Sequence, residues 1–222
     1  TGYGASGPKA DKAAHDLNYV AESGMLALVP RPGEAPSMPP TLIADIGAGA
    51  YPAVINVLLG LQGRQATGSG CHIDVSMSDN VLPFMYSAIG EALGLGRLPR
   101  PGMELTSGGS PRYNVYRTAE GRHVAAAPLE QRFWDRFCEV IALPQDLRDD
   151  ARSPDATRAG VARAIAAHTA EHWQRVFHGV DACVSVVATL EEALEDAHFR
   201  ARGVFAYRVG TGNGDMPAAP VA

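Results

Sequence analysis

One segment, DIGAGAYPAVINVLLGL at residues 45–61, constrains the fold most, because almost every side of a helix formed from it is apolar. A helix of this kind lies in the core of a protein or in a membrane. Asp45, Pro52 and Asn56 interrupt the apolar run. We therefore predict a core helix, buried on every side, and no membrane span. The 222 residues, 46% hydrophobic and 19% charged, are typical of a globular protein.

Charge and cysteine content exclude further classes of protein. The net charge of -5 and the pI near 5.8 lack the basic surplus typical of nucleic-acid binding. Cys71, Cys138 and Cys183 are far apart and form no C-x-x-C pair, so neither a disulfide framework nor a zinc site is predicted. The sequence opens at Thr1 without a leader-like segment. We expect a cytoplasmic protein and an internal portion of a longer polypeptide.

The first eight residues, TGYGASGP, match the dinucleotide-binding spacing G-x-G-x-x-G through Gly2, Gly4 and Gly7. That motif binds a pyrophosphate only where a strand enters it and a helix leaves it. No strand precedes Gly2, and Pro8 with a charged stretch follows. We therefore predict a glycine-rich surface loop.

The remaining sequence predicts two regions joined by a linker rich in glycine and proline at residues 94–111. Before the linker we expect a helix at 15–28 that Gly24 interrupts, a strand at 71–75 and further helix after residue 76. After it we expect a hairpin of strands 113–117 and 123–127, a short strand at 184–187 and several helices. These helices are predicted at residues 130–141, 154–169, 171–177 and 190–199.

Few residues stand out as chemically active. His15 precedes a polar cluster, HDLNY, that is denser than a core-facing helix usually carries. Asp45 opens the apolar helix, where it fits an N-cap and a functional carboxylate beside Gly47 about equally well. Glu130 fits the first turn of a helix and needs no function there. His168 and His172 have helical spacing but no acidic partner, so no metal site is predicted.

Several long stretches resemble, in order and over the whole chain, the family III CoA-transferases (CaiB/BaiF), and within them the α-methylacyl-CoA racemases. They are GYGASGP, HDLNYVAESG, LIADIGAGAY, RQATGSGCHIDVSMSDNVL, GGSPRYNVYRTAEGRHVAAAPLEQRFW and TLEEALEDAHFRARGVF. The resemblance implies an α/β fold with a large nucleotide-fold-like domain, whose N-terminal part is absent here, and a small α+β domain. It places the large-domain portion with its linker at residues 1–110, the small domain at 111–200 and a segment returning to the large domain at 201–222.

The resemblance also implies a chemistry and its residues. The catalytic roles fall on His15, Asp45 and Glu130, the last of which supports the histidine. Substrate binding falls on the stretch Ala14, Asp16, Leu17, Asn18 and Tyr19, and we add Gly47 for its small size. Ala14 and Leu17 stand where the family commonly has Gly and Ile. The expected substrate is an acyl-CoA, with CoA as part of the substrate, no separate cofactor and no metal. The expected assembly is an interlocked homodimer.

Inversion next to a thioester carbonyl needs one base on each face of the α-carbon, and an imidazole and a carboxylate suit these roles. Backbone N–H groups at the start of the Asp45 helix are the expected donors to the enolate oxygen. Two alternatives remain open. In a CoA-transferase Asp45 is a nucleophile instead, and a non-catalytic member keeps the fold without turnover. His15 favours the racemase.

Overall fold

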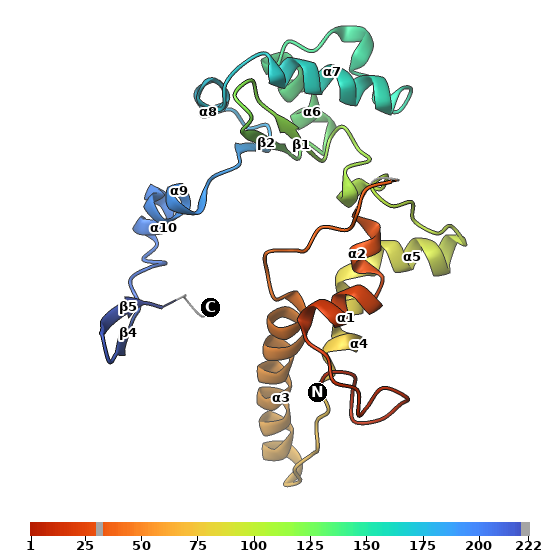
Figure 1. Ribbon diagram of the computed structural model, residues 1–222, viewed down its shortest axis with the longest axis vertical. Helices are drawn as coiled ribbons and strands as arrows, with labels where there is room; N and C mark the ends of the chain where they lie inside the picture. Colours follow the sequence, from red (N-terminus) through yellow and green to blue (C-terminus); the bar gives the residue numbers. More distant parts are fainter. Residues whose placement is uncertain (30–32, 219–222) are drawn as a thin grey trace. The chain divides into compact units, whose positions relative to one another are not determined.

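The computed structural model describes residues 1–29 and 33–218, in which the elements up to residue 107 are helices and short strands occur only after them (Figure 1). Their contacts divide the chain into unit 1, Thr1–Ser110, and unit 2, Pro111–Ala222. Residues 201–218 group with unit 2, whereas 219–222 lie outside the described residues. The return of segment 201–222 to a large domain stays a prediction.

Unit 1 is built from helices that are short except for one. The helix predicted at 15–28 with an interruption at Gly24 is confirmed as α1 and α2, and Gly24 between them has φ +90°, which favours glycine. The elements are α1 (Asp16–Glu22), α2 (Met25–Leu28), η1 (Ile43–Ala50), α3 (Tyr51–Thr67), α4 (Met77–Val81), η2 (Leu82–Met85), α5 (Tyr86–Leu95) and η3 (Leu105–Ser107).

The strand predicted at residues 71–75 is wrong, because this segment joins no ladder in the described part of the chain. It lies beside the first residues: the Thr1 amino group donates to the Val75 carbonyl at 2.8 Å, and the amides of Met77 and Ser78 donate to the carbonyls of Thr1 and Gly2.

The N-terminal glycines have packing and backbone reasons. A Cβ at Gly2 would clash with the Tyr19 hydroxyl oxygen, so a larger residue there would displace the Tyr19 side chain. Gly4 and Gly7 have φ values of +87° and +93°. These roles agree with the predicted glycine-rich loop.

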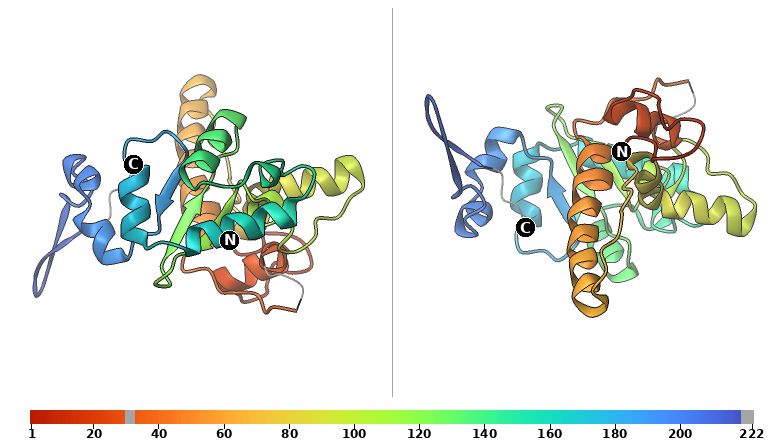
Figure 2. Two further views of the ribbon diagram at one scale, coloured as in Figure 1. Left: turned by 90° about the horizontal axis from the view of Figure 1, so that it is seen from above. Right: turned by 90° about the horizontal axis from the view of Figure 1, so that it is seen from below.

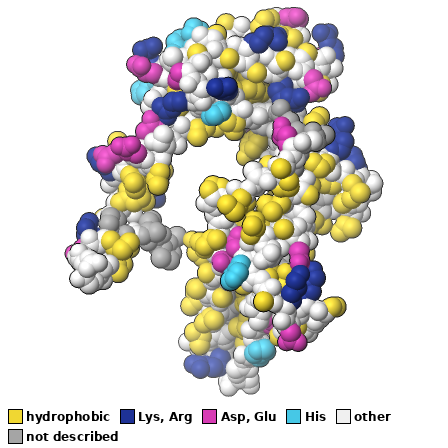
Figure 3. Space-filling view, in the orientation of Figure 1, with side chains coloured by type: hydrophobic (Ala, Val, Ile, Leu, Met, Phe, Trp, Pro, Cys, Tyr) yellow, Lys and Arg dark blue, Asp and Glu magenta, His cyan; other side chains and the backbone are white. Residues whose placement is uncertain are grey.

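The apolar segment forms one continuous helix, 43–67, whose first part, η1, is a wide π-helix and whose remainder is α3. The prediction that it is buried on every side is wrong, since no residue of α3 is buried. Exposed apolar side chains gather over α3, at the lower left of Figure 3; among them are Val54, Ile55, Val57, Leu58, Leu59 and Leu61. The helix is also long and apolar enough to cross a membrane, a test that core helices of soluble proteins pass as well.

Unit 2 carries an antiparallel sheet of order β1-β2-β3, formed by Asn114–Arg117, His123–Ala126 and Val184–Val186. The predicted hairpin is confirmed, with Val115 opposite Ala125. Helices α6 (Gln131–Val140), α7 (Pro154–Ala166) and α8 (Ala170–Phe177) accompany the sheet, and α7 and α8 contact it directly (Figures 1 and 2). A turn, η4 (Gln145–Leu147), links α6 and α7.

A single core fills unit 2. Helices α6 and α8 each bury one apolar stripe, Trp134, Phe137 and Cys138 on the former and Trp173 and Phe177 on the latter. Phe137 and Phe177 stack with ring centroids 6.0 Å apart, which joins the two stripes. Amphipathic helices of ordinary length are therefore enough to form the core of unit 2.

The C-terminal part of unit 2 departs from the predictions in two places. The helix predicted at 190–199 divides into α9 (Leu190–Glu195) and α10 (Ala197–Ala201), because Asp196 stops the first and caps the second through the amides of His198 and Phe199. A hairpin of β4 (Arg208–Thr211) and β5 (Gly214–Pro217) was not predicted. Its two-residue turn, Gly212 and Asn213, is a hairpin signal that the sequence carries.

Candidate active site

His15 lies at the start of α1 as the residue that precedes the first turn, with extended backbone and an exposed side chain. Its amide donates to Asn18 Oδ1 at 3.1 Å, and the Asn18 amide donates to the His15 carbonyl at 2.8 Å. Asn18 therefore fixes the His15 backbone and leaves the imidazole free of the cap. Its contact with substrate stays a prediction.

Tyr19 is a buried residue of α1 that fixes the backbone of Ala14, the residue before His15. Its hydroxyl donates to the Ala14 carbonyl at 3.0 Å, and its ring packs edge-on against Tyr3 with centroids 5.1 Å apart. Burial, with Tyr3 and Asp45 nearby, raises the pKa of Tyr19. The phenol thus remains a donor at neutral pH, and the His15 backbone is held from both sides.

Asp45 is the third residue of η1 and is half-buried. The N-cap is Leu42, so the interpretation of Asp45 as an N-cap is wrong. Within residues 1–29 and 33–218 the structure gives its carboxylate no hydrogen-bond donor. The described part of the fold therefore does not engage the Asp45 carboxylate, and its catalytic role stays a prediction.

Asp16 connects the two candidate bases. It is buried, with 6% of its surface exposed, and its Oδ1 accepts the amides of Ala44 at 2.7 Å and of Asp45 at 3.0 Å. The Ile46 amide donates to the Leu42 carbonyl at 3.0 Å. The expectation that the first amides of this helix serve the enolate oxygen is therefore wrong for Ala44, Asp45 and Ile46. The uncapped helix start at Leu42 is the signal by which a remote acceptor could have been foreseen.

The small residues behind Asp45 make room for neighbouring side chains. A Cβ at Gly47 would lie 3.0 Å from Phe84 Cζ, and one at Gly49 would lie 3.0 Å from Met77 Cγ. Gly47 thus has a packing role, whereas contact with a substrate stays a prediction. Leu17 on α1 is 42% exposed and Ala14 is half-buried.

Glu130 lies in unit 2, at the N-cap of α6, with an exposed side chain. Arg112 fixes the residues on either side of it, because its Nη1 donates to the Leu129 carbonyl at 3.2 Å and its Nη2 to Gln131 Oε1 at 2.8 Å. The same guanidinium makes a bidentate pair with Asp150 at 2.9 and 2.7 Å. Glu130 therefore projects from a fixed turn, and its support of His15 stays a prediction.

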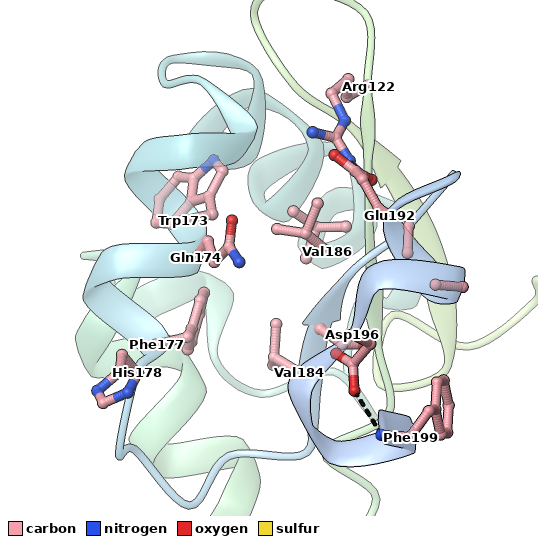
Figure 4. A pocket seen from close by; sticks show the side chains of 14 residues that line it. Arg122, Trp173, Gln174, Phe177, His178, Val184, Val186, Glu192, Asp196 and Phe199 are labelled. Carbon is pink, nitrogen blue, oxygen red and sulfur yellow. Dashed lines mark hydrogen bonds and ion pairs between the residues drawn. The ribbon is translucent and has the colours of Figure 1, made fainter. Parts of the chain in front are cut away.

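Unit 2 also contains a pocket of about 390 Å³ that holds none of the predicted site residues. Side chains of α8, among them Trp173 and Phe177, face Val184 and Val186 of β3 across it (Figure 4). Its rim is polar, and the charges there are already paired, Arg122 with Glu192 at 2.6 Å. Asp196 accepts backbone amides of α10. The pocket thus offers no free charge from these three side chains.

The described residues contain no group of three or more side chains suited to a metal. Of the two histidines with helical spacing, His168 lies in the break between α7 and α8, and His172 lies in α8. Their rings stack with centroids 4.0 Å apart, and burial, with His168 and Arg175 nearby, lowers the pKa of His172.

Comparison with known proteins gives the family. The sequence model of the CoA-transferase family III matches residues 1–222. The human alpha-methylacyl-CoA racemase is 33% identical over 92% of this chain and 54% of its own length. The acetyl-CoA:oxalate CoA-transferase of Acetobacter aceti is 26% identical over 100% of this chain and 58% of its own. The chain therefore belongs to the CoA-transferase family III.

The fold agrees with this membership. A CAIB/BAIF family protein from Brucella suis has a TM-score of 0.74 at 21% identity, over 100% of this chain and 59% of that one. The expected fold class is thereby confirmed. The chain spans about half the length of the curated relatives it matches, and it adopts the corresponding part of the family fold.

Proposed function

We propose that this chain carries the two bases of a racemase acting on 2-methyl-branched acyl-CoA thioesters. One observation carries the proposal: the Asp16 carboxylate, next to His15 in the chain, bonds the amide of Asp45 at 3.0 Å. It therefore ties the two candidate bases to packed elements of one unit, α1 and η1. The 33% identity to the human racemase supports the choice of reaction.

The proposed reaction moves one proton off the α-carbon and another on. The imidazole of His15 accepts the α-proton from one face, and the electron pair of the broken C–H bond forms the enolate of the thioester. Asp45, protonated, then donates to the opposite face and ends as a carboxylate. After one inversion His15 holds the extra proton, so the pair is set for the other enantiomer until its protons exchange with solvent. Glu130 is proposed to orient the imidazole in the working enzyme.

The decisive experiment follows α-proton exchange and inversion in D2O, with a 2-methylacyl-CoA of known configuration and the protein that contains this chain. His15→Ala and Asp45→Ala should each lower the inversion rate at least about 10³-fold, since general acid–base groups contribute on the order of 10²–10⁴. His72→Ala, which removes an exposed histidine of the same unit, is the matched control and should retain the wild-type rate. Wild-type inversion by either base variant would end the proposal.

A second candidate, a CoA-transferase, is supported by the match to the Acetobacter aceti enzyme over the full chain. In that reaction a carboxylate oxygen of Asp45 attacks the thioester carbonyl, the CoA thiolate leaves and a mixed anhydride forms. Hydroxylamine converts such an anhydride to a hydroxamate on Asp45, which mass spectrometry detects. Trapping without deuterium at the α-carbon would select the transferase, and absence of both activities would indicate a non-catalytic member.

We also propose that the protein acts as a homodimer. Sedimentation of the protein that contains this chain tests this, and a monomer at micromolar concentration would contradict it.

A further inference from the structure

Asp16 has the surroundings of a structural carboxylate, although its motif suggests contact with substrate. It is 94% buried by its 6% exposure, and one oxygen, Oδ1, accepts two backbone amides at 2.7 and 3.0 Å. A carboxylate held by two N–H donors in a buried place is strongly oriented.

The two amides that donate to Asp16 lie in the first turn of η1, the helix that carries Asp45. The first N–H groups of a helix have no partner within it and need an acceptor. Leu42, the N-cap of η1, has an apolar side chain and supplies none. Asp16 replaces the missing cap from 29 residues away in sequence. It thereby fixes the backbone of Asp45 against α1.

The wide geometry of η1 increases the need for such a fixed point. A π-helix is rare and places its residues at spacings that an ordinary helix does not use. The hydrogen bond at the Asp45 amide fixes the position of the Asp45 Cα. The Cα in turn fixes the point from which the side chain with its carboxylate extends. His15 lies one peptide bond from Asp16, with its own backbone held by Asn18. The Asp16 carboxylate thus ties the Asp45 backbone to the helix that His15 precedes.

We propose that the Asp16 carboxylate is a positioning group that sets Asp45 relative to His15 and makes no contact with the acyl-CoA. This inference rests on the proposed function, in which these two residues are the bases. A displacement of about 1 Å at a reacting group costs on the order of 10²-fold in rate. Loss of Asp16 therefore acts on the Asp45 step, whereas the His15 step keeps its geometry through Asn18.

The test measures α-hydrogen exchange in D2O from each enantiomer separately. In a two-base enzyme, Asp45→Ala stops exchange only from the enantiomer whose α-hydrogen faces Asp45, and His15→Ala stops it only from the other. Asp16→Ala should repeat the Asp45→Ala pattern, with kcat lowered about 10–100-fold for that enantiomer and KM within about twofold. Asp16→Asn keeps a weaker oxygen acceptor in place. Its kcat should therefore fall for the same enantiomer, but by a smaller factor than in Asp16→Ala.

Asp74→Ala is the matched control. Asp74 also accepts a backbone amide in unit 1, that of Ala5 at 2.6 Å, but it contacts neither α1 nor η1 by a hydrogen bond in the described residues. This variant should exchange both enantiomers at the wild-type rate. Circular dichroism and thermal unfolding show whether each variant folds, and Asp16→Asn decides the question if Asp16→Ala does not.

Three results would overturn the inference. A raised KM with unchanged kcat makes Asp16 a substrate contact. Equal loss for both enantiomers makes it a general structural residue, and undiminished exchange makes it dispensable. If His15→Ala and Asp45→Ala themselves show no selectivity for an enantiomer, the two-base proposal fails, and the positioning role fails with it.

Discussion

The two units differ in how their cores are built. Among the described residues, unit 2 has a core cluster of thirteen buried residues, which joins the sheet to α6, α7 and α8. Unit 1 has a cluster of five, Tyr19, Val20, Ala44, Ala48 and Val81, although it contains the most apolar helix of the chain. Unit 2 therefore has its own hydrophobic stabilisation, whereas unit 1 leaves much of its apolar surface exposed.

The difference shows how the candidate bases are held. In unit 1 the small core brings α1 and η1 together, and polar contacts of Asp16, Asn18 and Tyr19 set the positions around His15 and Asp45. Directional hydrogen bonds define geometry more sharply than apolar contacts do. The apolar side chains of α3 take no part in holding these residues, since none of them is buried.

Thiol alkylation should separate the units most strongly. Burial raises the pKa of Cys138 from 9.0 to about 12. At pH 8 this lowers the reactive thiolate about 10³-fold relative to an ordinary thiol. Cys138 should therefore react with iodoacetamide at least that much more slowly than exposed Cys71 of unit 1, as peptide mass spectrometry would measure. Equal rates would mean that the unit 2 core is open.

The same shift predicts a dependence of stability on pH. Because the folded pKa of Cys138 lies above the unfolded value, its contribution is full below about 9 and decreases as the pH rises towards 12. Cys138→Ala should remove this alkaline decrease in the free energy of unfolding, which urea titrations at pH 8 and 10 would show.

Trp134→Ala should lower the free energy of unfolding by about 3–5 kcal/mol, because a large buried side chain leaves a cavity. Trp134 has 0% exposure and donates through its indole N–H to the Arg148 carbonyl at 2.8 Å. Leu58→Ala on α3, where Leu58 is 62% exposed, is the control from unit 1 and should change stability by less than about 0.5 kcal/mol. A large loss at Leu58 would show that α3 is covered in the protein tested.

Val20→Ala probes the small core of unit 1. The side chain has 0% exposure, and loss of two methyl groups at about 0.8 kcal/mol each, with a small cavity, should cost about 2 kcal/mol. Leu17→Ala on the exposed face of α1 is the control and should cost less than about 0.5 kcal/mol. Urea denaturation measures both, and equal costs would contradict the assigned core.

Glu22→Gln should have the smallest effect. Hydrogen bonds from Lys12 and Lys9 lower the pKa of Glu22 from 4.5 to about 2, but the pair is exposed to solvent. A lowered folded pKa means that the contribution is present above about 4.5 and is lost as the pH falls to about 2. The Tm difference from wild type should shrink as the pH falls from about 4.5 to about 2, and it should also shrink in 1 M salt, where the screening length is about 3 Å. A difference of the same size at pH 4.5 and pH 2 would assign Glu22 another role.

Most of the secondary structure could be predicted from the sequence, because local signals fix it. Gly24 interrupts the first helix, the TAEG turn closes the β1-β2 hairpin, and apolar stripes at helical spacing mark α6 and α8. The family could be predicted as well, since long motifs in a fixed order carry it. The exposure of α3 and the absence of a strand at residues 71–75 of the described chain could not be predicted from the sequence. Both depend on which other segments lie beside these residues.

For the site, the sequence by itself determined which residue types are available and that His15 and Asp45 are unusual. Only the tertiary structure decided that Asp16 caps η1, that Gly47 makes room for Phe84, and that Asn18 and Tyr19 hold the backbone around His15. The physical reason is the range of the interactions. Propensity and hydrophobic periodicity act over a few residues, whereas a buried carboxylate takes whichever donors the folded chain brings to it, here 28 and 29 residues away.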